Sequence, residues 1–145
     1  MMDNKREQGG FTLGELILVF AFVGLLAAVL FPFIRHTLAK TDKVLCANNI
    51  REIGRSLYIY AREHEGNFPP TLNTLYDEKY LSDVKLLDCP ANRNTGDLEY
   101  PDYIYTGGLN VNDASRKELL KDRKRNHPDR GRNILYLNGD IYWKP

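Results

Sequence analysis

Residues 11–34 read FTLGELILVFAFVGLLAAVLFPFI, and this stretch decides how the chain is organised. From Leu16 to Ile34 it carries no charged and no polar side chain. About 19 residues of helix, at roughly 1.5 Å each, cover close to the 30 Å hydrocarbon core of a bilayer. A buried core helix is the alternative, but such helices are usually shorter and rarely apolar on every side. The stretch therefore predicts a membrane span.

The rest of the chain is polar and has the composition of one small soluble domain. The chain has 145 residues, of which 27% are charged, and its net charge is +1. This length leaves room for one domain beside an anchor. Because the charges nearly cancel, the overall balance gives no case for a nucleic acid or an anionic surface as partner.

The residues in front of the span contain one chemical anomaly, the carboxylate of Glu15. Burying a carboxylate at the edge of a spanning helix costs several kcal/mol unless the charge is paired, so Glu15 is a candidate functional residue. The plain alternative places it among lipid headgroups. An ordinary secretory signal does not explain the stretch, because the apolar run is too long and no Ala-x-Ala site follows it.

The residues around Glu15 resemble the prepilin N-terminal cleavage and methylation segment of type IV pilins and type II secretion pseudopilins. The resemblance is carried by residues 10–16, GFTLGEL, and by the apolar run behind them. It implies a leader peptide at residues 1–10 that a prepilin peptidase removes between Gly10 and Phe11 on the cytoplasmic side. Methylation of the new amino group of Phe11 should follow.

The resemblance also implies that residues 11–34 form a transmembrane and assembly helix. In a filament core of low dielectric constant, Glu15 of one subunit would pair with the amino group of Phe11 in a neighbour and set the axial register. Pro32 falls where many of these proteins carry a helix-bending proline. Its missing N–H predicts a kink or a locally melted turn.

Partners and location follow from the same resemblance. The partners would be the prepilin peptidase and methylase, identical or related pilin subunits and an inner-membrane assembly platform. Lys and Arg flank the span on both sides, so charge does not choose the orientation. The orientation follows instead from the peptidase, which cleaves on the cytoplasmic side. We expect a bacterial inner-membrane protein that crosses once, with a cytoplasmic N-terminus, an extracytoplasmic, periplasmic head at residues 35–145, and a later place in a filament.

Beyond the span, apolar residues recur at helical spacing from Arg35 to about His64. They are Leu38, Leu45, Cys46, Ile50, Ile53, Leu57 and Tyr60 or Ala61. Residues 66–70, GNFPP, predict the end of this helix. Joined to the span, it makes one helix of about 50 residues whose outer half must pack on the rest of the chain.

The remaining chain predicts short elements. Residues 71–81 predict a brief helix, and residues 103–105 predict a strand. Residues 133–143, NILYLNGDIYW, predict a hairpin, because Asn138-Gly139 between two β-prone runs favours a tight primed turn. The predicted fold is α+β and pilin-like, a long N-terminal helix with a membrane half and an amphipathic half that packs on a small antiparallel sheet.

Residues 116–132 are rich in Lys and Arg, with acidic residues among them. A solvated loop or a short helix is the expected structure. A DNA-contacting patch is the alternative, but the segment contains no Phe, Tyr or Trp for base stacking. We therefore expect no nucleic acid partner.

The two cysteines, Cys46 on the predicted helix and Cys89 before Pro90, suggest one disulfide in an extracytoplasmic domain. Two separately buried thiols are the alternative. The three histidines lie far apart without metal-ligand spacing, and the single carboxylate of Asp140 is too little for a calcium site. We expect neither an enzyme nor a cofactor or metal.

The predicted function is that of a structural subunit in a type II secretion pseudopilus or a type IV pilus-like filament. The alternative is a minor pilin that acts as an adhesin or as a DNA-uptake binding subunit. A third possibility is a membrane-anchored protein that never assembles. The small head favours the structural subunit over the adhesin.

Overall fold

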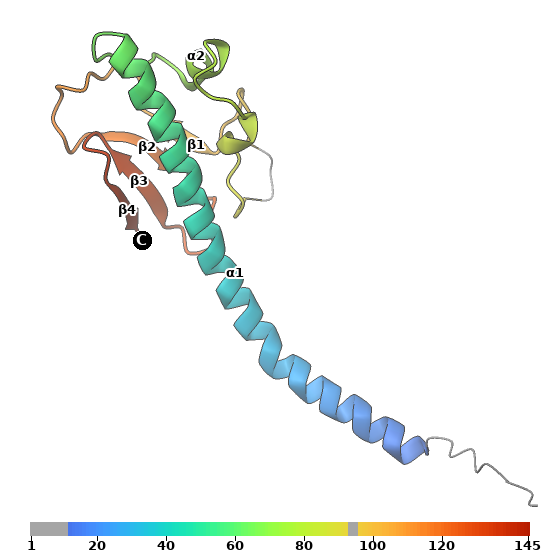
Figure 1. The fold of residues 1–145 in the computed structure, drawn as a ribbon. Coiled ribbons are helices and arrows are strands. Elements are labelled where there is room, and N and C mark those ends of the chain that lie inside the picture. Colours follow the sequence, from blue (N-terminus) through green and yellow to red (C-terminus); the bar gives the residue numbers. More distant parts are fainter. Residues whose placement is uncertain (1–11, 93–95) are drawn as a thin grey trace, which may run out of the picture. The chain divides into compact units, whose positions relative to one another are not determined.

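The computed structural model describes residues 12–92 and 96–145. The chain divides into two compact units, one that ends at Thr37 and one that runs from Leu38 to Pro145. The helix α1, Leu13–Glu63, has 51 residues and contributes to both units (Figure 1). The prediction of one long N-terminal helix is confirmed. The predicted leader, residues 1–10, lies outside the described residues.

The first unit contains the apolar part of α1. Its 22 residues Leu13–Ile34 are long and apolar enough to cross a membrane, and none of the segment is buried against other described residues. Three successive side chains, Ile17, Leu18 and Val19, are 61%, 72% and 52% exposed. Because successive helix positions point about 100° apart, the helix is apolar on every side. Such a surface is typical of a helix surrounded by lipid or by other helices.

The second unit contains a four-stranded antiparallel sheet in the order β1-β2-β3-β4. The strands are β1 Tyr103–Tyr105, β2 Glu118–Asp122, β3 Arg132–Tyr136 and β4 Ile141–Lys144. In Figure 1 the sheet, in orange and red, lies alongside the green half of α1. Each strand pairs with its neighbour in sequence, as short connections favour. The small antiparallel sheet is therefore confirmed.

One face of α1 forms the centre of the core in this unit. Its buried residues are Cys46, Ile50, Ile53, Gly54, Leu57, Tyr60 and Ala61. A Cβ on Gly54 would lie 2.7 Å from Cδ2 of Leu135 in β3, so the absent side chain allows helix and sheet to approach closely. Leu45 was predicted to face the core, but it is 42% exposed. It lies about 100° around the helix from Cys46, outside the face of α1 that packs in the core.

The segment that holds β2 differs from its prediction. A solvated loop or a short helix was expected for residues 116–132, and for β2 this is wrong. Leu119 and Leu120 are fully buried, and a register shift between Glu118 and Leu120 disturbs the usual alternation of faces. Two apolar residues between charged ones are too few to produce a periodic signal.

The β3–β4 hairpin is confirmed, but its turn is not the predicted one. Tyr136 N–H donates to the carbonyl of Asp140, and Gly139 N–H donates to the carbonyl of Tyr136, both at 2.9 Å. A primed two-residue turn of either type needs positive φ at its first central residue, which here is Asn138. Only Gly139 has it, at 87°. The connection is a three-residue loop that ends on a left-handed glycine.

The other predicted elements are present. Helix α1 ends at Glu63, where Glu65 and Gly66 take positive φ and Gly66 N–H donates to the carbonyl of Ala61. Helix α2, Leu72–Asp77, is N-capped by Thr71 and is shorter than expected. A 3-10 helix, Val84–Leu87, follows it and leads into the loop that carries Cys89.

Candidate functional site

Glu15 lies in the first turn of α1 and is hydrogen-bonded within that turn. The main-chain N–H and the hydroxyl of Thr12 donate to Oε2 of Glu15 at 2.9 and 3.1 Å, and Glu15 N–H donates to Oγ1 of Thr12 at 3.3 Å. This reciprocal arrangement is a capping box. The pattern Thr-x-x-Glu is its local signature, and our reading of the sequence missed it.

The capping box changes what the presence of Glu15 implies. A carboxylate that caps its own helix has a role even in a chain that never assembles, so it does not separate a filament subunit from a simple anchor. Among residues 12–92 and 96–145, Glu15 forms no ion pair. A cationic partner would have to come from outside this part of the chain.

The other predicted residues of the N-terminal segment are described in part. Gly10 and Phe11 lie outside the described residues. Pro32 lies inside α1, and the helix continues through it, so the locally melted turn is not formed. A Cβ on Gly24 would meet nothing within 4 Å.

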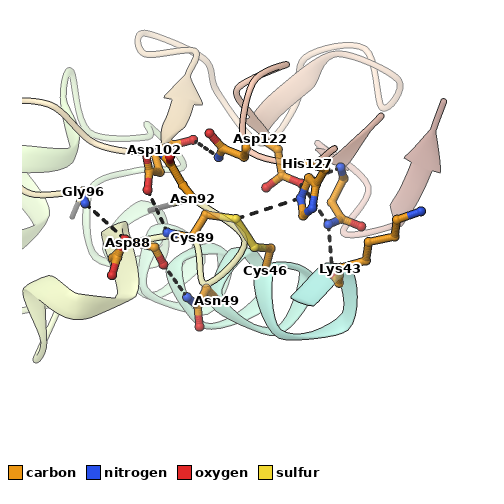
Figure 2. The surroundings of a disulfide bond; sticks show 12 residues. Lys43, Cys46, Asn49, Asp88, Cys89, Asn92, Gly96, Asp102, Asp122 and His127 are labelled. Carbon is orange, nitrogen blue, oxygen red and sulfur yellow. Dashed lines mark hydrogen bonds and ion pairs between the residues drawn. A yellow bond between two sulfur atoms is a disulfide. The ribbon is translucent and has the colours of Figure 1, made fainter. Parts of the chain in front are cut away.

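In the second unit, Cys46 and Cys89 form a disulfide between positions 43 residues apart, with their Cα atoms 5.4 Å apart (Figure 2). Cys46 belongs to the buried face of α1, and Cys89 belongs to the loop after the 3-10 helix. Both residues are fully buried. The bond therefore attaches a loop without regular structure to the core.

A group of buried polar residues surrounds the disulfide, and we call it the buried polar cluster. Its members are Asp102, Asp122, Asn126, His127 and Asn133, each no more than 5% exposed. Sequence analysis singled out none of them. In the sequence they sit near strand ends and turns, where polar residues are usually exposed, so no local signal distinguishes them.

Asp102 holds the loop that carries Cys89. Its Oδ2 accepts the main-chain N–H of Cys89 at 2.9 Å, and its Oδ1 accepts Nδ2 of Asn92 at 2.6 Å. Burial raises the pKa of the Asp102 carboxyl, and the hydrogen bond from the Cys89 main chain works in the opposite direction. Asn126 donates to the main-chain carbonyl of Asp102 at 2.7 Å and ties the loop to the β2–β3 connection.

Asp122, at the end of β2, is the most connected carboxylate of the cluster. Its Oδ2 lies 2.9 Å from Nε2 of His127, and both side chains are 0% exposed. Asn133 donates to the same Oδ2 from its main chain at 2.8 Å and from Nδ2 at 2.9 Å. Nδ2 of Asn133 also lies 3.1 Å from the carbonyl of Lys43, which ties β2 and β3 to α1.

His127 lies beside the disulfide, with its Nε2 3.9 Å from Sγ of Cys89 (Figure 2). Two atoms of the pair, Oδ1 of Asp122 and Nδ1 of His127, are buried and have no hydrogen-bond partner among the described residues. An unsatisfied buried polar atom costs roughly 1–3 kcal/mol. Sequence spacing gave no sign that a histidine and the cysteines would meet.

Exposed basic side chains gather around the β2–β3 connection. Arg123, Lys124, Arg125 and Arg132 line a surface pocket together with Tyr100. Tyr100 comes from a different segment and is 70% exposed. The fold therefore places beside the basic residues an aromatic ring that their own segment lacks.

Within the described residues, three groups thus stand out as candidate sites. The first is the capped turn with Glu15 at the start of an exposed apolar helix. The second is the buried polar cluster with its disulfide. The third is the basic pocket with Tyr100. Comparison of the chain with protein-family models, with curated proteins and with solved structures returned no match.

Proposed function

We propose that the chain is a structural subunit of a type II secretion pseudopilus or a type IV pilus-like filament, cleaved after Gly10 and methylated on Phe11. One observation carries the proposal. The motif GFTLGEL at residues 10–16 runs into a helical segment, Leu13–Ile34, that no described residue covers. A helix with apolar side chains on every side suits lipid before assembly and neighbouring helices afterwards.

The geometry of Glu15 is compatible with the pairing between subunits. Both bonds from Thr12 go to Oε2, and Oε1 receives neither of them. A carboxylate accepts several hydrogen bonds, so the amino group of Phe11 in a neighbouring subunit could bind Oε1 while the cap stays intact. In a filament core of low dielectric constant, a bond between this carboxylate and a charged amino group is stronger than the bonds from the uncharged donors of Thr12.

The second unit supports the same proposal. The amphipathic half of α1 packs on a small antiparallel sheet, which is the layout expected of a pilin-like head. A structural disulfide is typical of a compartment outside the cytoplasm. We therefore place the head in the periplasm, with the N-terminus in the cytoplasm and the segment Leu13–Ile34 of α1 across the inner membrane.

Processing is tested by expressing the full chain in a bacterium that has prepilin peptidase and measuring its N-terminus by mass spectrometry. The wild-type protein should begin at N-methylated Phe11. Gly10→Val should keep its leader, and Gly9→Ala, the matched control, should be processed normally. An intact leader with an unmethylated Phe11 in the wild-type protein would overturn the proposal.

Assembly is tested with two variants that separate charge from capping. Glu15→Gln keeps a capping oxygen at the same position but removes the charge, whereas Thr12→Ala removes both bonds of the Thr12 hydroxyl and keeps the charge. We expect Glu15→Gln to be cleaved and excluded from filaments, and Thr12→Ala to be incorporated. If Thr12→Ala is excluded as strongly as Glu15→Gln, the role of the carboxylate is capping, and the pairing argument fails.

A minor pilin that binds DNA is the second candidate, and the pocket with Tyr100 favours it. Basic side chains can track phosphates while an exposed aromatic ring stacks on a base. Single-stranded DNA should then bind the full chain in detergent at low salt, more weakly after Tyr100→Ala or Arg125→Glu. Absence of binding at low salt would remove this candidate and leave the structural one.

A further inference from the structure

Four potential metal ligands from four parts of the second unit meet in its core. Cys46 comes from α1, Cys89 from the loop after the 3-10 helix, Asp122 from the end of β2 and His127 from the β2–β3 connection (Figure 2). One ligand atom of each lies within 4.8 Å of the other three, and all four residues are buried. Sulfur, imidazole nitrogen and carboxylate oxygen are the donor atoms of tetrahedral zinc sites in proteins.

We propose that the head can adopt a second folded form. In this form the disulfide is reduced, and these four residues bind one zinc-like divalent cation. The ligands are the two thiolates, Nε2 of His127 and one carboxylate oxygen of Asp122. The disulfide and the metal use the same two sulfur atoms, so each excludes the other. The inference concerns the head alone and stands whether or not the chain assembles into filaments.

One ligand atom of such a site is unused, and His127 would exchange its contact with Oδ2 of Asp122 for the metal. Oδ1 of Asp122 is buried without a hydrogen-bond partner among the described residues, while Oδ2 accepts the bonds from Asn133 and faces His127. Asp122 can therefore bind a metal through Oδ1 without losing the contacts from Asn133. Nε2 of His127 already points towards Sγ of Cys89, at 3.9 Å.

The backbone that positions the ligands does not depend on the disulfide alone. The main-chain N–H of Cys89 is bonded to Asp102 at 2.9 Å, and Asn133 connects Asp122 to the carbonyl of Lys43 on α1. The Cα atoms of the two cysteines are 5.4 Å apart. From these positions the two sulfurs can separate by rotation of their side chains once the bond between them is broken.

Charge also favours a cation in the reduced form. Among the described residues, His127 is the only His, Lys or Arg whose side-chain nitrogen lies within 4.0 Å of the Asp122 carboxylate. Two thiolates beside this carboxylate would place three negative charges in the core, which is prohibitive without compensation. A divalent cation with a neutral imidazole lowers the total to one negative charge.

A dithiol reductant is sufficient to convert the disulfide form into the form that binds the metal. A dithiol supplies two electrons and two protons, the S–S bond breaks, two thiols form, and the reductant becomes a disulfide. Binding of the cation then releases the two thiol protons to solvent.

The test uses the full chain in detergent micelles. The protein is reduced with a phosphine, separated from it without oxygen, and titrated with Co²⁺ as a spectroscopic substitute for zinc. We expect one Co²⁺ per chain, with thiolate-to-cobalt absorption in the near ultraviolet and the intense visible bands of a tetrahedral ion. Zinc should displace it. The oxidised protein should give neither signal, and equal binding to the oxidised protein would overturn the proposal.

Two ligand variants separate a four-ligand site from binding by the thiols alone. Asp122→Asn and His127→Asn should each weaken Co²⁺ binding at least about tenfold, because even residues behind the ligands contribute that much. His64→Asn changes a histidine outside the cluster and should bind like the wild-type protein. Wild-type affinity in both ligand variants, or no cobalt bands in reduced protein that keeps its near-ultraviolet circular dichroism, would overturn the proposal.

A stability measurement on the wild-type chain tests the proposal even if a ligand variant does not fold. Zinc at about 100 times its dissociation constant stabilises a folded state by about 2.7 kcal/mol, and it should therefore raise the Tm of the reduced wild-type chain. The Tm of the oxidised chain should not change. An unchanged Tm in the reduced chain at saturating zinc would contradict the proposal.

Discussion

Reduction of the Cys46–Cys89 disulfide in the presence of a chelator should destabilise the head by about 4 kcal/mol. The bond joins residues 43 positions apart. For a closed loop of that length, the chain-entropy relation gives a loss of roughly 13 cal/mol/K in the unfolded state, or about 4 kcal/mol at 25 °C. Because the unfolded chain regains this entropy on reduction, the free energy of unfolding should fall by the same amount.

The assay is thermal unfolding of the full chain in detergent, followed by near-ultraviolet circular dichroism. Trp143 is the only tryptophan and lies against the ring of His127, with 5.1 Å between ring centroids, so the signal reports on the head. At about 4 °C per kcal/mol for a domain of this size, Tm should fall by roughly 15 °C. Zinc in place of the chelator should restore part of the loss.

The control is the double variant Cys46→Ala and Cys89→Ala, which should unfold near the Tm of the reduced wild-type protein. Its Tm should be the same with and without the reductant. A fall of less than about 3 °C in the wild-type protein would correspond to under 1 kcal/mol. That result would refute the reasoning, because the loop between the cysteines would then not be constrained by the bond.

Two further predictions concern single residues of the head. Gly54→Val should lower the free energy of unfolding by roughly 1–3 kcal/mol, read from the urea midpoint, because the added atoms collide with Leu135; an unchanged midpoint would contradict this close approach. The ion pair with Lys43 lowers the pKa of Asp129, so its stabilisation is present above the unfolded pKa of about 4 and is lost as the pH falls through the lower folded pKa. Asp129→Asn should therefore flatten the acid limb of a stability–pH curve, and a curve identical to that of the wild-type protein would show that the pair contributes nothing.

The long helix and the hairpin could be predicted because each has a local signal of sufficient length. The apolar run and the 3.6-residue spacing behind it extend over many turns, and Asn138-Gly139 marks a connection between two β-prone runs. Local signals do not determine detail as well. In the turn, Gly139 has positive φ and Asn138 does not. Strand β2 contains only two apolar residues, and charged residues flank them on both sides.

The candidate site could be predicted only where its residues are neighbours in sequence. The pattern of Thr12 and Glu15 already contains the capping box, so that contact was accessible to a closer reading. The contact between His127 and Cys89 was not, because the two residues are 38 positions apart and meet only when β2 pairs with β3 and packs on α1. Burial of Asp122 likewise depends on tertiary structure.

The position of Asn133 has a consequence for how the sheet finds its alignment. Its main chain and side chain both bond Asp122 across the β2–β3 pair, and its side chain also reaches the carbonyl of Lys43. A slip of β3 by one residue would turn this amide to the opposite face and leave a carboxylate in the core with one partner fewer. Misaligned pairings of the two strands are therefore less stable, and the hydrogen bonds of Asn133 favour a single register.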